Sequence, residues 1–82
     1  MLDRKKLYSS LKEGKVQITF ESANSGREIV LDTTLNQKLV PDLRDFRQNV
    51  ELSDTLLVWR LDNQKWEDIR MESITSWQIL TK

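Results

Sequence analysis

Residues 55–80 read TLLVWRLDNQKWEDIRMESITSWQIL, and this stretch decides the fold of the chain. It holds all three tryptophans, and its β-branched and aromatic residues recur in short runs that are typical of β-strands. The runs are separated by a polar turn and by one tight helical turn. We therefore predict a three-stranded C-terminal part over 55–82, with strands at 55–61, 66–70 and 76–80, the polar turn at 62–65 and the helical turn at 71–73.

A second piece of sheet is predicted over residues 15–34. The segment 15–22 (KVQITFES) alternates apolar and polar side chains with the period of two expected for a half-buried strand. The segment 27–33 (REIVLDT) is predicted to return antiparallel to it. The residues between them include Asn24 and Gly26, which both tolerate the positive φ angles of tight turns. Together the two segments indicate a β-hairpin.

The first 14 residues indicate a short helix over 4–13. Asp3 is placed to cap its first turn, and Gly14 is placed to end it in a left-handed conformation. A helix of this length is unstable alone in water, so we expect Leu7 and Leu11, which lie on one side, to pack against the sheet.

Residues 35–54 are predicted to be a connection. Charges occupy nearly every second position in 42–54, and the spacing of Leu43, Phe46 and Val50 leaves a short helix open there. A loop of this length is uncommon in a small domain and is often functional. With 82 residues in all, the chain is long enough for a single domain over 1–82.

Composition excludes several classes of site. The chain has no cysteine and no histidine, so zinc, copper and haem sites lose their usual ligands, and nucleophilic Ser–His or Cys–His pairs are absent. We therefore expect no cofactor, no metal and no enzymatic activity. The formal net charge is zero, which gives no general attraction to nucleic acid or membranes. No apolar run reaches the roughly 18 residues of a membrane span, and we expect a cytoplasmic protein.

Five short strands with one helical turn before the last predict a mainly β fold, a small, strongly bent SH3-like or Sm-like barrel with a short N-terminal helix. The segments 14–32 (GKVQITFESANSGREIVLD) and 56–80 (LLVWRLDNQKWEDIRMESITSWQIL) resemble, in sequence and order, the two halves of a WYL domain. They are most similar to the short stand-alone WYL-like proteins of tailed bacteriophages. The resemblance implies an Sm-like five-stranded barrel and a phage-encoded protein that acts in the cytoplasm of its host.

The resemblance also implies a candidate ligand site. In larger WYL proteins, basic residues of a segment like R-x-F-R-L-D-R-I bind nucleic acid or nucleotides. Those basic positions fall here on Glu67, Arg70 and Ser73, so Arg70 alone is retained and the first position has reversed charge. Arg70 is the candidate anion-binding residue, with Arg60 across the hairpin as a helper. The competing interpretation is an arginine that is solvated or paired with a nearby carboxylate.

Two further sets of residues are candidates for nucleic-acid binding. Trp59 and Trp66 flank the 62–65 turn as cross-strand neighbours, and they either stack unpaired bases or hold together a thin core. Lys5 and Lys12 belong to a basic helix face that either binds phosphate or is simply solvated.

Two functions follow as hypotheses. The first is a non-enzymatic binding module that contacts nucleic acid or a nucleic-acid-associated regulatory protein. The alternative is a protein–protein interaction domain that acts on a host protein, or that self-associates into a homo-oligomer through exposed strand edges. No membrane partner is expected.

Overall fold

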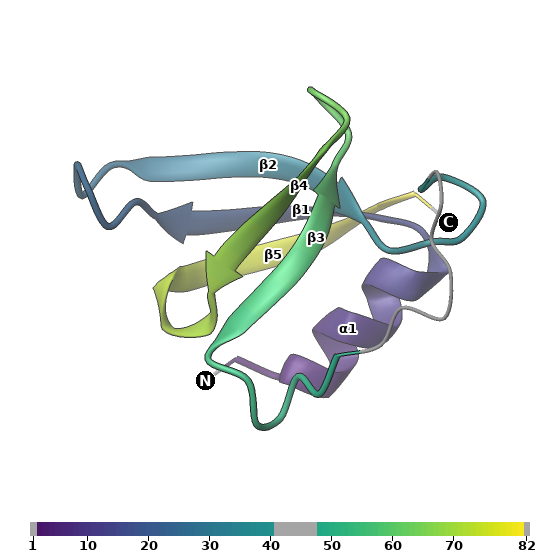
Figure 1. The fold of residues 1–82 in the computed structure, drawn as a ribbon, viewed down its shortest axis with the longest axis horizontal. Coiled ribbons are helices and arrows are strands. Elements are labelled where there is room, and N and C mark those ends of the chain that lie inside the picture. Colours follow the sequence, from purple (N-terminus) through teal and green to yellow (C-terminus); the bar gives the residue numbers. More distant parts are fainter. Residues whose placement is uncertain (1, 41–47, 82) are drawn as a thin grey trace.

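The computed structural model describes residues 2–40 and 48–81, and its fold is mainly β with one N-terminal helix (Figure 1). The predicted helix and all five predicted strands are present, with strand ends that differ from the predicted ones by one or two residues. The elements in chain order are α1 (Arg4–Glu13), β1 (Lys15–Glu21), β2 (Glu28–Thr34), β3 (Thr55–Arg60), β4 (Lys65–Arg70), the 3₁₀ helix η1 (Met71–Ser73) and β5 (Ile74–Thr81).

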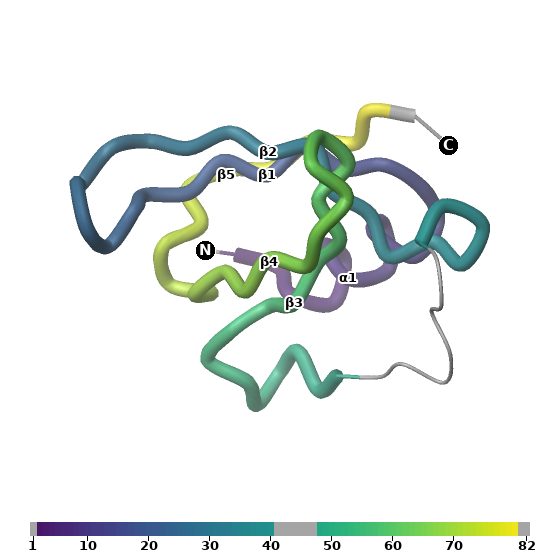
Figure 2. Tube along the Cα trace, turned by 45° about the horizontal axis from the view of Figure 1, so that its top comes forward, coloured from purple at the N-terminus to yellow at the C-terminus, as the bar shows by residue number. Residues whose placement is uncertain are grey.

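The five strands form one antiparallel sheet in the order β4-β3-β2-β1-β5. The expected closed barrel is wrong, because no pairing joins β4 to β5 in the part of the chain that the structure describes. The reason lies at the junction of β2 with β3, where only Thr33 with Arg60 and Thr34 with Trp59 are paired. From this short junction the β3–β4 pair crosses away from the β1–β2 hairpin, and β4 and β5 are linked through η1 without pairing (Figure 2).

The β1–β2 hairpin is paired along its whole length, and its turn has the predicted chemistry. Gly26 has a φ of 68°, in the left-handed region that glycine enters without a Cβ penalty, whereas Asn24 does not adopt a positive φ. The amide of Gly26 donates to the Ser22 carbonyl at 2.9 Å. The tip of this hairpin projects beyond the β3–β4 pair (Figure 1).

Helix α1 covers the end of the sheet opposite to the hairpin tip (Figures 1 and 2). Its first turn is capped as predicted, since an Asp3 carboxylate oxygen accepts from the Lys6 amide at 3.0 Å. Leu7 and Leu11 are fully buried against the sheet. The predicted left-handed Gly14 is wrong: its φ of 178° is extended backbone, which leads the chain directly into β1.

The core lies between the two diverging halves of the sheet. β1 contributes Val16 and Ile18, and the β3–β4 pair contributes Leu56, Val58 and Ile69, all essentially inaccessible to solvent. The predicted core residue Trp77 is half-buried and packs against the margin of this cluster. None of the described helices is long and apolar enough to cross a membrane.

A buried hydroxyl ties α1, β1 and β2 together. Thr34 is fully buried at the end of β2, and its Oγ1 donates to the Gly14 carbonyl at 2.7 Å. The same oxygen accepts from the Asn36 amide at 3.1 Å. The Asn36 side chain in turn donates to the Lys12 and Glu13 carbonyls, so the C-terminal end of the helix is closed by residues that follow β2.

The predicted connection is described over residues 35–40 and 48–54, so the helix suggested by Leu43, Phe46 and Val50 lies partly outside the described residues. Where it rejoins the sheet, the Gln48 amide bonds both backbone groups of Leu57, donating to its carbonyl at 2.9 Å and accepting from its N–H at 3.0 Å. The Arg4 guanidinium reaches across from α1 and donates to three backbone carbonyls, those of Val50, Glu51 and Ser53. These contacts hold the segment 48–53 against the helix and β3.

Candidate binding groove between β2 and β4

A groove of about 720 Å³ opens between the projecting half of the β1–β2 hairpin and the β4–η1 segment, at the end of the molecule that α1 does not cover. We call it the β2–β4 groove. It exists because β2 and β3 part after two residue pairs and leave the inner faces of the two sheet halves uncovered. Its lining residues are Phe20, Glu21, Ser22, Ala23, Asn24, Gly26, Ile29, Leu31, Arg60, Glu67, Asp68, Ile69, Arg70, Glu72, Ser73 and Thr75.

The apolar part of the lining is continuous with the core. Ile29 and Leu31 reach it from the inner face of β2, and Phe20 lies opposite Ile29 in the β1–β2 ladder. Ile69 comes from β4 and is almost fully buried. Of these four side chains, Ile29 is the one that keeps substantial exposure, so it presents the accessible apolar surface of the groove.

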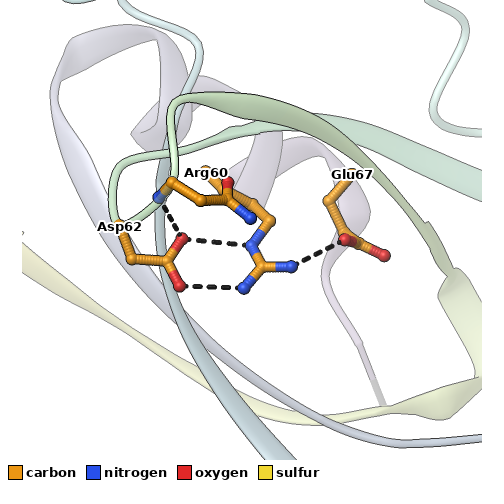
Figure 3. A network of polar contacts seen from close by, with 4 residues as sticks. Arg60, Asp62 and Glu67 are labelled. Atoms are coloured by element: carbon orange, nitrogen blue, oxygen red, sulfur yellow. Dashed lines mark hydrogen bonds and ion pairs between the residues drawn. The ribbon is translucent and has the colours of Figure 1, made fainter.

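Arg60 lies in the groove but is already neutralised. Its guanidinium donates to both carboxylate oxygens of Asp62, at 3.1 and 2.8 Å, and to Glu67 at 3.1 Å (Figure 3). Its pKa is raised above the ordinary value, chiefly by the hydrogen bond to Asp62 and also by Glu67. The same bond lowers the pKa of the Asp62 carboxyl. A bidentate arginine–carboxylate pair with a second acceptor leaves little donor capacity for an incoming anion.

Arg70 lines the same groove and forms an ion pair with Glu72. Arg60 lies across the hairpin from it, on β3, but the two arginines are not directly opposite each other. Arg60 faces Lys65 in the β3–β4 ladder, whereas Arg70 faces Thr55 at its far end, because the two arginines terminate opposite ends of the hairpin. Of the two interpretations of Arg70 drawn from the sequence, the carboxylate-paired one describes its contacts.

Acidic residues outnumber arginines around the groove. Its lining residues include two arginines and four acidic residues. The register places Arg60 and Glu67 on the inner face, whereas Asp68 and Arg70 share the face of the tryptophans and Glu21 lies beside Glu28 on the outer face of the hairpin. Arg60 and Arg70 account for Glu67 and Glu72, and no ion pair involves the other two carboxylates, Glu21 and Asp68, among the described residues. The sequence reasoning missed these acidic groups as a set, because they come from β1, β4 and η1 and converge only when the hairpin projects over β4.

The outer edge of β2 borders the groove. The Asp32 carbonyl accepts from the Leu61 amide at 2.9 Å, which places the backbone groups of Asp32 on the side of β3. Backbone groups alternate along a strand, so those of Val30 and Glu28 point to the same side. There β3 has already ended, since its pairing with β2 is confined to Thr33 and Thr34. This part of the edge therefore faces solvent beside the groove.

The two tryptophans are cross-strand neighbours, as predicted. Trp59 faces Trp66 in the ladder, and their rings meet edge to face with centroids 5.4 Å apart and an interplanar angle of 79°. Neither ring lines the groove, since both lie near the turn end of the β3–β4 pair and on the face opposite to Val58 and Ile69. Each tryptophan already has the other as its aromatic partner, and this contact braces the turn, which covers residues 61–64 in the structure.

The helix lysines lie apart from the groove. Lys5 forms an ion pair with Glu51 at 2.8 Å, and the Lys12 ammonium lies over the Tyr8 ring at 5.4 Å from its centroid. Neither residue lines the groove. The six candidate residues thus divide into three separate places: Arg60 and Arg70 in the groove, Trp59 and Trp66 on the outer face, and Lys5 and Lys12 on the helix.

Across residues 2–40 and 48–81, no three acidic side chains gather closely enough to hold a metal ion. Comparison with protein-family models, with curated proteins and with solved structures found no match for this chain. The WYL-like resemblance therefore stays a prediction, and the groove is the site on which a function is proposed.

Proposed function

We propose that the protein is a non-enzymatic binding module whose β2–β4 groove holds a segment of a partner protein. The observation that carries the proposal is the state of the two groove arginines. Arg60 is held by Asp62 and Glu67, and Arg70 by Glu72. A nucleic-acid phosphate would have to displace these carboxylates, whereas a polypeptide does not.

The electrostatics of the groove favour protein over nucleic acid. Affinity for nucleic acid comes largely from lysines and arginines that neutralise phosphates and release counterions. Four acidic residues against two arginines around the groove repel the phosphate backbone instead. Lys5 and Lys12, the other candidate phosphate ligands, lie on α1 outside the groove and have contacts of their own. A nucleic-acid-associated regulatory protein remains an acceptable partner, because its own surface would supply the complementary charge.

The same geometry supports a finer description of the fold. We propose that the open sheet is a splayed form of the SH3-like or Sm-like barrel that the WYL-like resemblance implies. Five antiparallel strands are present, which is the number that the resemblance implies, and the N-terminal helix and the 3₁₀ turn before β5 occur where the sequence pattern predicts them. In this description the groove is the gap that barrel closure would have filled. Origin in a bacteriophage and action in the host cytoplasm are part of the same proposal.

A selection from a random-peptide library tests the function. The bait is the whole protein, and peptides that also bind an Ile29→Lys variant are removed beforehand. This variant places a charge on the accessible apolar surface of the groove. Ile79→Lys is the matched control, because Ile79 is 51% exposed on β5 and does not line the groove. We expect enriched peptides to bind the wild type and the Ile79→Lys control but not the Ile29→Lys variant.

Two results would overturn the proposal. One is the absence of any peptide whose binding depends on Ile29. The other is binding of short single-stranded or double-stranded nucleic acid at low salt that is abolished when Arg60 and Arg70 are both replaced by alanine. Fluorescence anisotropy of labelled oligonucleotides measures the second outcome directly.

A further inference from the structure

We infer that the groove takes its partner as an added β-strand, paired with the outer edge of β2 at Glu28 and Val30, and that this strand carries lysine or arginine. The inference rests on the proposed function and specifies the chemistry of the partner. Strand addition gives affinity through main-chain hydrogen bonds and specificity through alternate side chains.

The backbone of β2 is prepared for pairing on one side only. Its inner edge is fully used by β1, which pairs with every residue from Glu28 to Thr34. On its outer edge, β3 pairs with Thr33 and Thr34, and the Leu61 amide reaches the Asp32 carbonyl. Beyond this point β3 has ended and the chain has entered the turn at 61–64, so the next outward-facing backbone groups of β2 are those of Val30 and Glu28. An added strand would lie along the outer edge of β2, next to the end of β3, and pair with these free backbone groups.

The side chains of such a strand would meet two different surfaces. Alternate side chains of neighbouring strands share a face, so those on the inner face would lie beside Ile29 and Leu31, over the apolar part of the groove. The others would lie beside Glu28, Val30 and Asp32 on the outer face, where Val30 is 51% exposed. A segment of small apolar residues alternating with long basic ones fits both surfaces.

Charge selects the occupant. Glu21, Glu28 and Asp32 lie on the outer face of the hairpin, and the groove is bordered by three further acidic residues and two arginines. Lysine or arginine in the added strand would neutralise this excess, whereas an acidic strand would be repelled. The same carboxylates disfavour pairing with the β2 edge of a second copy of this chain. Two β2 strands side by side would bring Glu28 and Asp32 of one copy close to the same carboxylates of the other, and these would repel each other. Inward and edge-lying charges are a common means of preventing self-pairing of free strands.

The test uses a synthetic peptide of alternating lysine and valine, with the same sequence in glutamate and valine as its charge control. Amide exchange measured by NMR on the whole protein is the readout. We expect the basic peptide to slow exchange at Glu28 and Val30, the acidic peptide to leave it unchanged, and the affinity of the basic peptide to fall as salt is added.

Two changes to the backbone test the pairing itself. Val30→Pro removes the outward amide at a position where an edge strand tolerates proline, and Val30→Thr is the matched control that keeps the amide. Loss of one main-chain hydrogen bond predicts roughly tenfold weaker binding of the basic peptide to the proline variant, with no change for threonine. Two peptides, one N-methylated at its valines and the other at its lysines, give the same test on the unaltered protein. An added strand turns the amides of only one of the two sets toward β2, so we expect one of the two peptides not to bind.

The outcomes separate this inference from the proposed function. Equal binding to the proline and threonine variants, or undiminished binding of both N-methylated peptides, overturns strand addition. If library peptides still depend on Ile29 in that case, the groove binds protein by another mode and the proposed function stands. Equal affinity for the acidic and basic peptides overturns the assignment of a basic partner. If no library peptide depends on Ile29 either, both proposals fall together.

Discussion

Replacement of Thr34 by valine should destabilise the fold far more than the same change at its neighbour, Thr33. Both threonines are fully buried at the end of β2, and valine has nearly the same shape as threonine. The two hydroxyls differ in what depends on them. Thr33 Oγ1 donates to the Val16 carbonyl at 2.8 Å, and β1 is a central strand whose carbonyls face ladder partners on one side or the other.

Thr34 serves groups that lie outside the ladders. Its Oγ1 donates to the Gly14 carbonyl, at the junction of α1 and β1, and accepts from the Asn36 amide. Valine leaves both without this partner, and an unsatisfied buried polar group costs about 1–3 kcal/mol. Because the Asn36 amide is only partly buried, we expect Thr34→Val to lower the free energy of unfolding by about 2–4 kcal/mol. For a domain of this size that corresponds to a Tm lower by roughly 10–25 °C.

Equilibrium unfolding in urea, followed by tryptophan fluorescence, measures the difference. We expect Thr33→Val to cost about 1 kcal/mol or less, since the Val16 carbonyl keeps its place in the ladder. Thr34→Ser separates the hydroxyl from the methyl group: it keeps both hydrogen bonds and should cost about 1 kcal/mol for the lost methyl. Equal losses for the two valine variants, or a serine variant as unstable as Thr34→Val, would refute this account of the junction.

Three further changes are expected to act locally. Arg4→Ala should lower the free energy of unfolding by about 1–2 kcal/mol, because three carbonyls lose a charged donor, and it should speed amide exchange over 49–53; unchanged exchange there would contradict the role of Arg4. Gln64→Gly should raise the free energy of unfolding by about 0.5–1 kcal/mol, because Gln64 has a φ of 55°, which glycine adopts without strain. Asn63→Gly is the control and should not raise it. Asp62→Asn should be destabilising at neutral pH. The pKa of Asp62 in the folded protein is lowered below 3.8, so its ion pair stabilises the fold above that pH. The difference in free energy of unfolding between wild type and variant should therefore shrink as the pH falls through the lowered pKa. Urea unfolding at a series of pH values measures it.

Local patterns predicted the elements well because each is decided by a few adjacent residues. Alternation over β1 and β2, and the cap at Asp3, need no distant information. The Trp59–Trp66 contact was predictable too, because the length of the 62–65 turn sets the register of β3 and β4. Gly14 shows the limit of such rules, since a buried glycine that enters a strand directly has no need of a left-handed conformation.

The groove was beyond the reach of sequence patterns for a geometric reason. Closure of the sheet depends on how many residues of β3 pair with β2. That number is set by the angle at which the two halves of the sheet cross, and neither strand's sequence encodes this angle by itself. The bonds of Arg60 illustrate the consequence: Glu67 becomes its acceptor only because Glu67 faces Val58, the inner-face residue two before Arg60 on β3. The pairing of Arg70 with Glu72 is a contact between near neighbours in sequence, and the sequence predicts a carboxylate-paired Arg70 as one of two alternatives.

The position of β1 at the centre of the sheet has a consequence for synthesis. β1 can pair with β2 as soon as the hairpin exists, but its other edge belongs to β5, and the Gln17–Gln78 contact joins residues 61 apart. At a translation rate of roughly 5–20 residues per second, β5 is synthesised about 3–12 seconds after β1, and until then this edge of β1 is unpaired. The nascent chain therefore passes through a stage with β1 half-covered, and pairing of such distant segments also slows folding. A chaperone that shields extended segments would find its substrate at this stage, in the exposed edge of β1.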